Sequence, residues 1–157
     1  MRPSACFAVP AMLASVALAA AAGSAVAGED DTQTLRGAVA IEFPSWDEKG
    51  SGCVSSPNGP APKLKKGKKV VVYEAVAQPD DSLELGDDPI ARGRVGTGRI
   101  NDETEACDIA FTVKNTPVIA QRNSYVIEVR GAPEFKYVPA ADVPPNGDIG
   151  VILTIEF

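Results

Sequence analysis

Apolar and polar residues alternate along much of the chain with a period of two, the spacing of a strand with one buried face. No segment has the 3.6-residue period of an amphipathic helix. Stretches rich in Gly, Pro, Asn and Asp separate the alternating segments, as is typical of turns between strands. Seven strands are therefore predicted, at residues 35–43, 69–77, 90–100, 107–114, 124–130, 134–138 and 149–157.

Two of these segments predict which side chains are buried. In the segment 107–114 the expected core face consists of Cys107, Ile109, Phe111 and Val113. In the last segment the expected core face consists of Val151, Leu153, Ile155 and Phe157. Several short strands with one buried face each are typical of a β-sandwich or a barrel.

The pattern predicts an all-β protein, a single seven-stranded antiparallel β-sandwich that occupies residues 35–157. Fourteen Gly and thirteen Pro agree with many turns. Residues 28–34 are polar and acidic, and we expect them to form a disordered leader. The sequence contains no tandem repeat and no sign of a second domain.

The first 27 residues have the pattern of a secretory signal peptide. Arg2 precedes an apolar stretch at 7–22, and the small residues Ala25 and Ala27 stand before the expected cleavage after Ala27. The alternative is a transmembrane helix, but alanines dominate the stretch where such a helix carries larger apolar residues. We expect the mature chain, residues 28–157, to be secreted, with no transmembrane segment.

Two cysteines remain after this cleavage, Cys53 and Cys107. Exported proteins meet oxidising conditions, and an even number of cysteines there indicates a disulfide. The alternative is a pair of free thiols for redox or metal chemistry. Their spacing is not C-x-x-C and no third ligand is evident, so we predict a Cys53–Cys107 disulfide.

Several segments resemble a known family. They are LRGAVAIEF, GKKVVVYEAVA, IARGRVGTGRI followed by CDIAFTV, and NSYVIEVRG. In this order they resemble the transthyretin-like and carboxypeptidase-regulatory-like β-sandwiches, which are similar to immunoglobulin domains. The chain is also similar to small secreted bacterial proteins with a Gly-Cys in the first loop and a second Cys in a middle strand. The resemblance implies the sandwich fold and carries over no site residue, because the His-containing sites of these families have no counterpart here.

The amino-acid composition excludes several kinds of catalytic and binding site. The chain has no His, which excludes Ser-His-Asp and Cys-His nucleophiles, His-ligated metals and histidine pH switches. Its formal net charge is −6, and a general nucleic-acid-binding protein would need a basic field instead. We expect no nucleic-acid partner.

A basic run stands out against this acidic background and predicts a binding region. It consists of Lys63, Lys65, Lys66, Lys68 and Lys69. It could contact an anionic polymer, lipid headgroups or an acidic partner, or it is only a solvated loop whose lysines discourage edge pairing. Trp46, in the polar segment before this run, is either an exposed binding anchor or a cap over the core.

The acidic loop at 78–89 is the candidate metal site. Its carboxylates belong to Asp80, Asp81, Glu84, Asp87 and Asp88. Carboxylate oxygens are the ligands that Ca²⁺ prefers, but the spacing is not that of an EF-hand. The alternative is a solvated loop. We expect no cofactor other than, at most, Ca²⁺ in this loop.

Three glycines, Gly93, Gly96 and Gly98, predict a β-turn or bulge, because no helix and no Lys-Ser/Thr pair follows them as in a phosphate-binding loop. The neighbouring Arg92, Arg94 and Arg99 either form a small positive face or pair with surface acids.

These features predict a secreted, non-enzymatic protein that binds a protein or a cell-envelope component through its loops. One alternative is a calcium-stabilised structural module of the envelope. A second alternative is a small hydrolase that uses two carboxylates, the minimum for glycoside hydrolysis.

Overall fold

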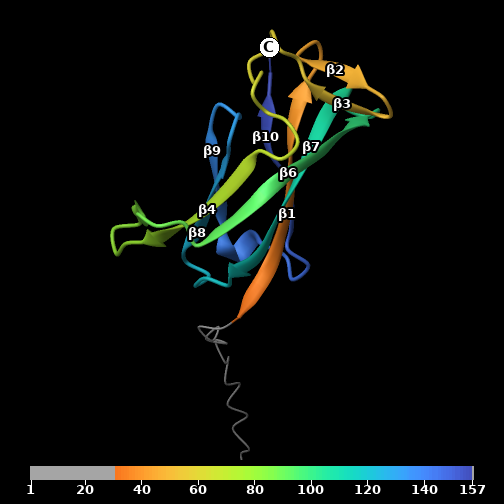
Figure 1. Ribbon diagram of the computed structural model, residues 1–157. Coiled ribbons are helices and arrows are strands. Elements are labelled where there is room, and N and C mark those ends of the chain that lie inside the picture. The colour runs from red at the N-terminus through yellow and green to blue at the C-terminus, as the bar shows by residue number, and fades with distance from the viewer. Residues whose placement is uncertain (1–30, 157) are drawn as a thin grey trace, which may run out of the picture.

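The computed structural model describes residues 31–156 (Figure 1), and in them the chain is all-β, with no α-helix. The elements are β1 (Thr32–Glu42), β2 (Trp46–Lys49), β3 (Gly52–Ser55), β4 (Lys69–Ala77), β5 (Leu83–Leu85), β6 (Ala91–Asn101), β7 (Ala106–Pro117), β8 (Ser124–Val129), β9 (Phe135–Pro139), the 3-10 helix η1 (Ala140–Asp142) and β10 (Asp148–Ile155). All seven predicted strands are present. The strands β2, β3 and β5 lie in segments predicted as loops.

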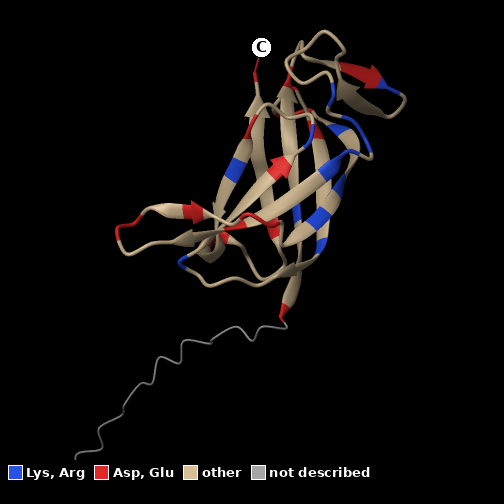
Figure 2. Cartoon of the chain, turned by 60° about the vertical axis from the view of Figure 1, so that its left-hand side comes forward, with Lys and Arg blue, Asp and Glu red and all other residues tan. Residues whose placement is uncertain are grey.

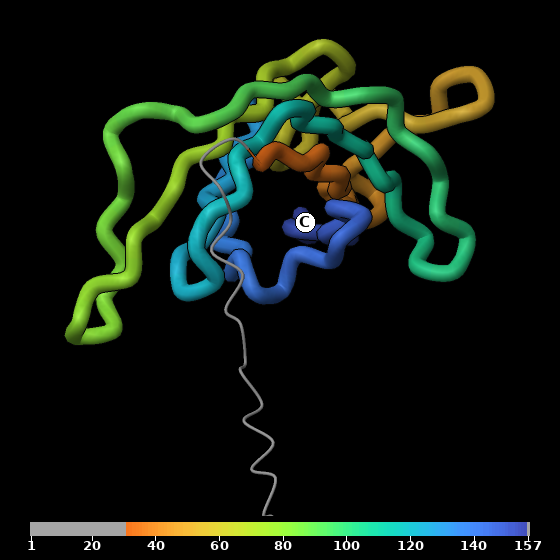
Figure 3. The backbone as a smooth tube through the Cα atoms, turned by 90° about the horizontal axis from the view of Figure 1, so that it is seen from below, coloured from red at the N-terminus to blue at the C-terminus, as the bar shows by residue number. Residues whose placement is uncertain are grey.

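The ten strands form one sheet, which corrects the predicted seven-stranded sandwich. The strand order is β10-β1-β7-β6-β4-β8-β9, with the hairpin β2–β3 attached to β6 and β5 attached to β4. The sheet curls until its edge strands β9 and β10 make contact, so that it is barrel-like and nearly closed (Figure 3). The alternation of apolar and polar residues does not distinguish a sandwich from a barrel, because every strand buries one face in both architectures.

The sheet is also not wholly antiparallel as predicted. The strand β1 pairs antiparallel with β7 but parallel with β10. A hairpin cannot join two parallel strands, and the chain enters β10 from β9 through η1 and a turn at Gly147. This glycine has a φ of 69°, and a Cβ there would collide with the carbonyl oxygen of Thr34. Its own carbonyl accepts a hydrogen bond from the Arg36 backbone N–H at 2.8 Å.

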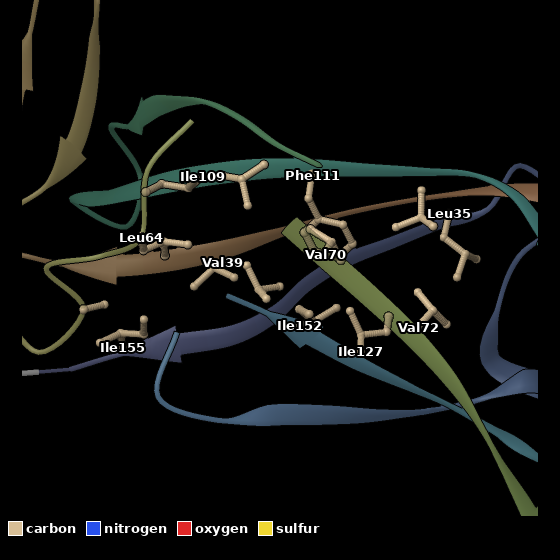
Figure 4. Packing of buried hydrophobic residues seen from close by; sticks show 14 of the residues in the cluster. Leu35, Val39, Leu64, Val70, Val72, Ile109, Phe111, Ile127, Ile152 and Ile155 are labelled. Atoms are coloured by element: carbon tan, nitrogen blue, oxygen red, sulfur yellow. The ribbon is translucent and has the colours of Figure 1, made fainter. Parts of the chain in front are cut away.

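The curled sheet encloses one hydrophobic core (Figure 4). The predicted core face of β7 is confirmed, with Cys107, Ile109, Phe111 and Val113 all buried. The predicted face of β10 is wrong in part, because Ile152 is buried while Val151 is 51% exposed. The register between β1 and β10 shifts twice between Arg36 and Val39, and such an irregularity breaks the period of two.

The N-terminal boundary differs slightly from the prediction. The strand β1 begins at Thr32, so the last three residues of the predicted leader 28–34 belong to the sheet, where Thr32 pairs with Pro117. The predicted signal peptide, residues 1–27, lies outside the described residues. Among the described residues, no helix has the length and apolar character needed to cross a membrane.

Candidate functional site

The predicted disulfide is confirmed. Cys53 on β3 and Cys107 on β7 are bonded, with their Cα atoms 5.8 Å apart, and both side chains are buried. The hairpin β2–β3 has only one register pair with the main sheet, Cys53 with Gly98 of β6. The disulfide therefore supplies the second attachment that fixes this hairpin against β6 and β7.

Close contact between β3 and β6 depends on two glycines. A Cβ at Gly98 would lie 2.8 Å from the sulfur of Cys107 and would collide with the Cys53 carbonyl oxygen. A Cβ at Gly52 would lie 2.5 Å from the Gly98 carbonyl oxygen. Only residues without a side chain allow the two backbones and the disulfide to approach this closely.

The Lys-rich loop, residues 63–69, is anchored by Leu64, whose side chain is 1% exposed. On its far side a turn closes with a 3.1 Å hydrogen bond from the Lys68 N–H to the Lys65 carbonyl, and Gly67 at its third position has a φ of 85°. These features are typical of a type II turn. The Gly67 N–H then donates to the Val95 carbonyl at 2.8 Å, so the loop is tied to β6 at a fixed position.

The predicted bulge in the glycine segment is confirmed. The register of β6 against β7 passes from Val95–Phe111 to Gly98–Ile109, so Gly96 and Thr97 together stand opposite a single residue of β7. Thr97 is exposed as a result. The bulge lies beside the Lys-rich loop and the disulfide.

A groove of about 470 Å³ opens where these parts meet, and we call it the basic groove. Its lining is Lys49, Ser51, Gly52, Cys53, Val54, Leu64, Lys65, Lys66, Gly96, Thr97, Gly98, Arg99 and Ile109. Four of these side chains are cationic, two carry hydroxyl groups, and none of these residues is acidic. The arrangement favours an anionic ligand, since a carboxylate, phosphate or sulfate can accept hydrogen bonds from ammonium, guanidinium and hydroxyl groups together.

Sequence reasoning identified part of this site. Of the five lysines predicted as a binding region, Lys65 and Lys66 line the groove, whereas Lys63, Lys68 and Lys69 are not among its lining residues. Lys49, the last residue of β2, was missed, and Arg99 of β6 was predicted only as part of a separate small positive face. Only the pairing of β3 with β6 brings these segments together.

Two of the three predicted arginines, Arg94 and Arg99, differ in environment. Arg94 donates a hydrogen bond to the Gly67 carbonyl at 3.0 Å, which ties its side chain to the Lys-rich loop. The acceptor of this bond is a backbone carbonyl and not an acidic side chain. Arg99 stands opposite Asp108 in the register of β6 and β7. Figure 2 shows basic residues along these neighbouring strands, on a different part of the molecule from the acidic β5 hairpin.

Trp46 is not among the residues that line the basic groove. Its ring is half-buried against the core, its Nε1 donates to the Glu105 carbonyl at 3.3 Å, and it meets Phe43 edge to face with centroids 6.4 Å apart. With Ile100, Asp102 and Glu105 these rings line a separate hollow of about 390 Å³. The structure therefore does not bring Trp46 together with the lysines, and its packing matches the predicted alternative of a cap over the core.

The five acids of the predicted metal site all have exposed side chains. In the described part of the chain, no three acidic, Cys or His side chains are grouped closely enough to hold a metal ion. Asp80 instead accepts hydrogen bonds from the Ser82 hydroxyl at 2.6 Å and from the Ser82 N–H at 3.1 Å. These bonds lower the pKa of Asp80. The arrangement gives no support to the calcium prediction, which stays a prediction.

No protein family, curated protein or solved structure matches this chain. The resemblance to transthyretin-like domains stays a prediction, and we take no residue role from it.

Proposed function

We propose that this chain is a non-enzymatic binding protein that acts outside the cytoplasm and holds an acidic group of its partner in the basic groove. The observation that carries the proposal is the convergence of Lys49, Lys65, Lys66 and Arg99 from three separate chain segments on one groove without an acidic lining residue. The partner is a protein or a component of the cell envelope.

The rigid surroundings of the groove support a binding role. The disulfide fixes one wall, and the buried Leu64 with the bonds to β6 fixes the other. Because the backbone that carries the donors is already held in place, binding orders only their side chains, and more of the interaction energy remains as affinity. The disulfide also agrees with a place outside the cytoplasm, where such bonds persist.

The proposal predicts that acidic ligands bind at Lys65 and Lys66. We would titrate a fluorescent poly-glutamate peptide with residues 28–157, which contain every strand of the described structure, and follow anisotropy. The variant Lys65→Gln/Lys66→Gln should bind at least about tenfold more weakly, equivalent to about 1.4 kcal/mol. Added salt should weaken binding to the native chain, because the groove is open to solvent.

The matched control is Arg122→Gln/Lys136→Gln, which removes the same charge from two exposed positions outside the groove lining. This variant should bind the peptide as the native chain does. Equal losses in the two variants would mean that the peptide senses only net charge, and the proposed function would then be wrong.

A further inference from the structure

The second prominent charged feature of the molecule is the acidic arm, residues 76–89, formed by the end of β4, the strand β5 and the segment that follows. Only Ala75, Val76 and Ala77 pair with β5. The arm projects from the body of the sheet (Figures 1 and 3). It carries the five exposed acids of the predicted metal site together with Leu83 and Leu85, which are 43% and 46% exposed.

The tip of the arm has a defined shape. The Gln78 N–H donates to the Ser82 carbonyl at 2.8 Å, and the Asp81 N–H donates to the Gln78 carbonyl at 3.1 Å. Asp80 accepts two hydrogen bonds from Ser82, which favour its ionised form. The arm therefore presents negative charges beside two apolar side chains that lie on one face of β5.

The basic groove has the complementary character. It combines four cations with Val54, Leu64 and Ile109 in its lining. An occupant with carboxylates beside short apolar side chains would pair with both parts of this lining. Within the described residues the acidic arm is such a segment.

The arm cannot reach the groove of its own molecule. The Lys-rich loop leads into β4 at Lys69 and the arm leaves the same strand at Ala75. A strand rises about 3.3 Å per residue, so the two lie roughly 20 Å apart at opposite ends of a rigid strand. Figure 1 shows the arm and the β2–β3 hairpin at opposite ends of the sheet.

We propose that the acidic arm of one copy of this chain is the ligand of the basic groove of the next copy. The inference rests on the proposed function, because it names the partner of the same groove. The contact joins two different surfaces, so two copies joined by a single such contact leave one arm and one groove free. Such a head-to-tail contact continues into chains of copies unless its rotation closes a ring.

The first test is the mass of residues 28–157, with the disulfide formed, measured by sedimentation velocity over a range of concentrations. At about 0.02 M salt the mean mass should rise with concentration, and at about 0.5 M salt it should fall towards that of the monomer, because screening weakens charge pairing. An excess of the poly-glutamate peptide should also reduce the mass. A monomer at every concentration would overturn the inference.

Two variants locate the contact. Asp80→Asn/Asp81→Asn removes two charges from the arm, and Asn can still accept the bonds at position 80 and tolerate the φ of 64° at position 81. Lys65→Gln/Lys66→Gln removes two charges from the groove. Each variant alone should be monomeric under conditions in which the native chain associates. The control Glu134→Gln/Asp142→Asn, at two exposed acids outside the arm, should associate normally.

Mixing the two monomeric variants is the decisive experiment. The groove of the arm variant is intact, and so is the arm of the groove variant, so the mixture should form a one-to-one complex that does not grow further. The inference would be overturned if either variant alone associated as strongly as the native chain, or if the mixture of the two stayed monomeric. If the native chain binds the peptide at Lys65 and Lys66 but does not self-associate, this inference fails while the proposed function stands. If the groove variant binds the peptide normally, both fail.

Discussion

The basic groove and the acidic arm are both charged regions at the ends of the strand β4, but they are held in different ways. The groove is fixed by the disulfide, by the buried Leu64 and by backbone bonds to β6. The arm is fixed by three residue pairs to β4 and exposes its leucines. Covalent and core anchoring make a loop part of the fold, whereas a hairpin that buries no apolar side chain is expected to open locally at low cost.

Breaking the disulfide should have the largest effect on stability, and it should affect the groove more than the arm. The cysteines lie 54 positions apart, and the chain-entropy estimate for a loop of this size is about 4 kcal/mol. Reduction, or Cys53→Ala/Cys107→Ala, should lower the free energy of unfolding by about that amount. Chemical denaturation measures it.

Hydrogen exchange then shows where the loss lies. Amides of β3 and the Lys-rich loop should exchange faster after reduction by more than the global change, while those of the arm should follow the global change alone. Equal changes in both regions would contradict the view that the disulfide chiefly anchors the groove.

Removing single leucines should sharpen the same contrast. Leu64→Ala should destabilise the fold by about 2 to 5 kcal/mol, because it empties a fully buried site beneath the Lys-rich loop. Leu83→Ala on the arm should change stability by less than about 0.5 kcal/mol, since the side chain is largely exposed. Thermal or denaturant unfolding compares the two. Similar losses would show that the arm is packed far more tightly than its exposure indicates.

The sequence was informative where a strand has one buried face. The alternation of Cys107, Ile109, Phe111 and Val113 arises because every second residue of β7 faces the core. The strands β2 and β5 are largely exposed and only four and three residues long, so they leave no such pattern. Closure of the sheet depends on contacts between β9 and β10 and on a parallel pairing that no local signal records.

Only part of the candidate site could be predicted from the sequence, for a similar reason. The run containing Lys65 and Lys66 can be recognised in the sequence because it is basic in an otherwise acidic chain. The disulfide can be predicted because an even number of cysteines remains after the expected cleavage. Lys49 and Arg99 join them only after β3 pairs with β6 at Gly98. Trp46 shares a hairpin with Lys49, yet it packs on a different side of the structure.

Glycine substitutions test the backbone contact at each region. Gly98→Ala should cost about 1 to 3 kcal/mol, because the new Cβ would overlap the disulfide and the β3 backbone, and neither can move freely. Gly86→Ala at the base of the arm should cost less than about 1 kcal/mol, because its nearest neighbour is the Glu74 carbonyl oxygen at 3.2 Å and the arm can yield. Denaturation midpoints give both values, and an equal cost at the two glycines would contradict the difference in rigidity.

The smallest effect concerns the charge at the tip of the arm. The Ser82 hydroxyl and N–H hold the pKa of Asp80 below its usual value, with the hydroxyl the larger cause. A lowered carboxyl pKa contributes stability above the usual value, and this contribution is lost as the pH falls through the value in the folded state, on the acid side of about pH 4. Ser82→Ala should raise the pKa of Asp80 towards that of a free side chain in a carboxyl-detected NMR titration. An unchanged pKa at Asp80 would mean that the turn does not hold the tip of the arm in solution, and the defined shape that suits it to the basic groove would then be lost.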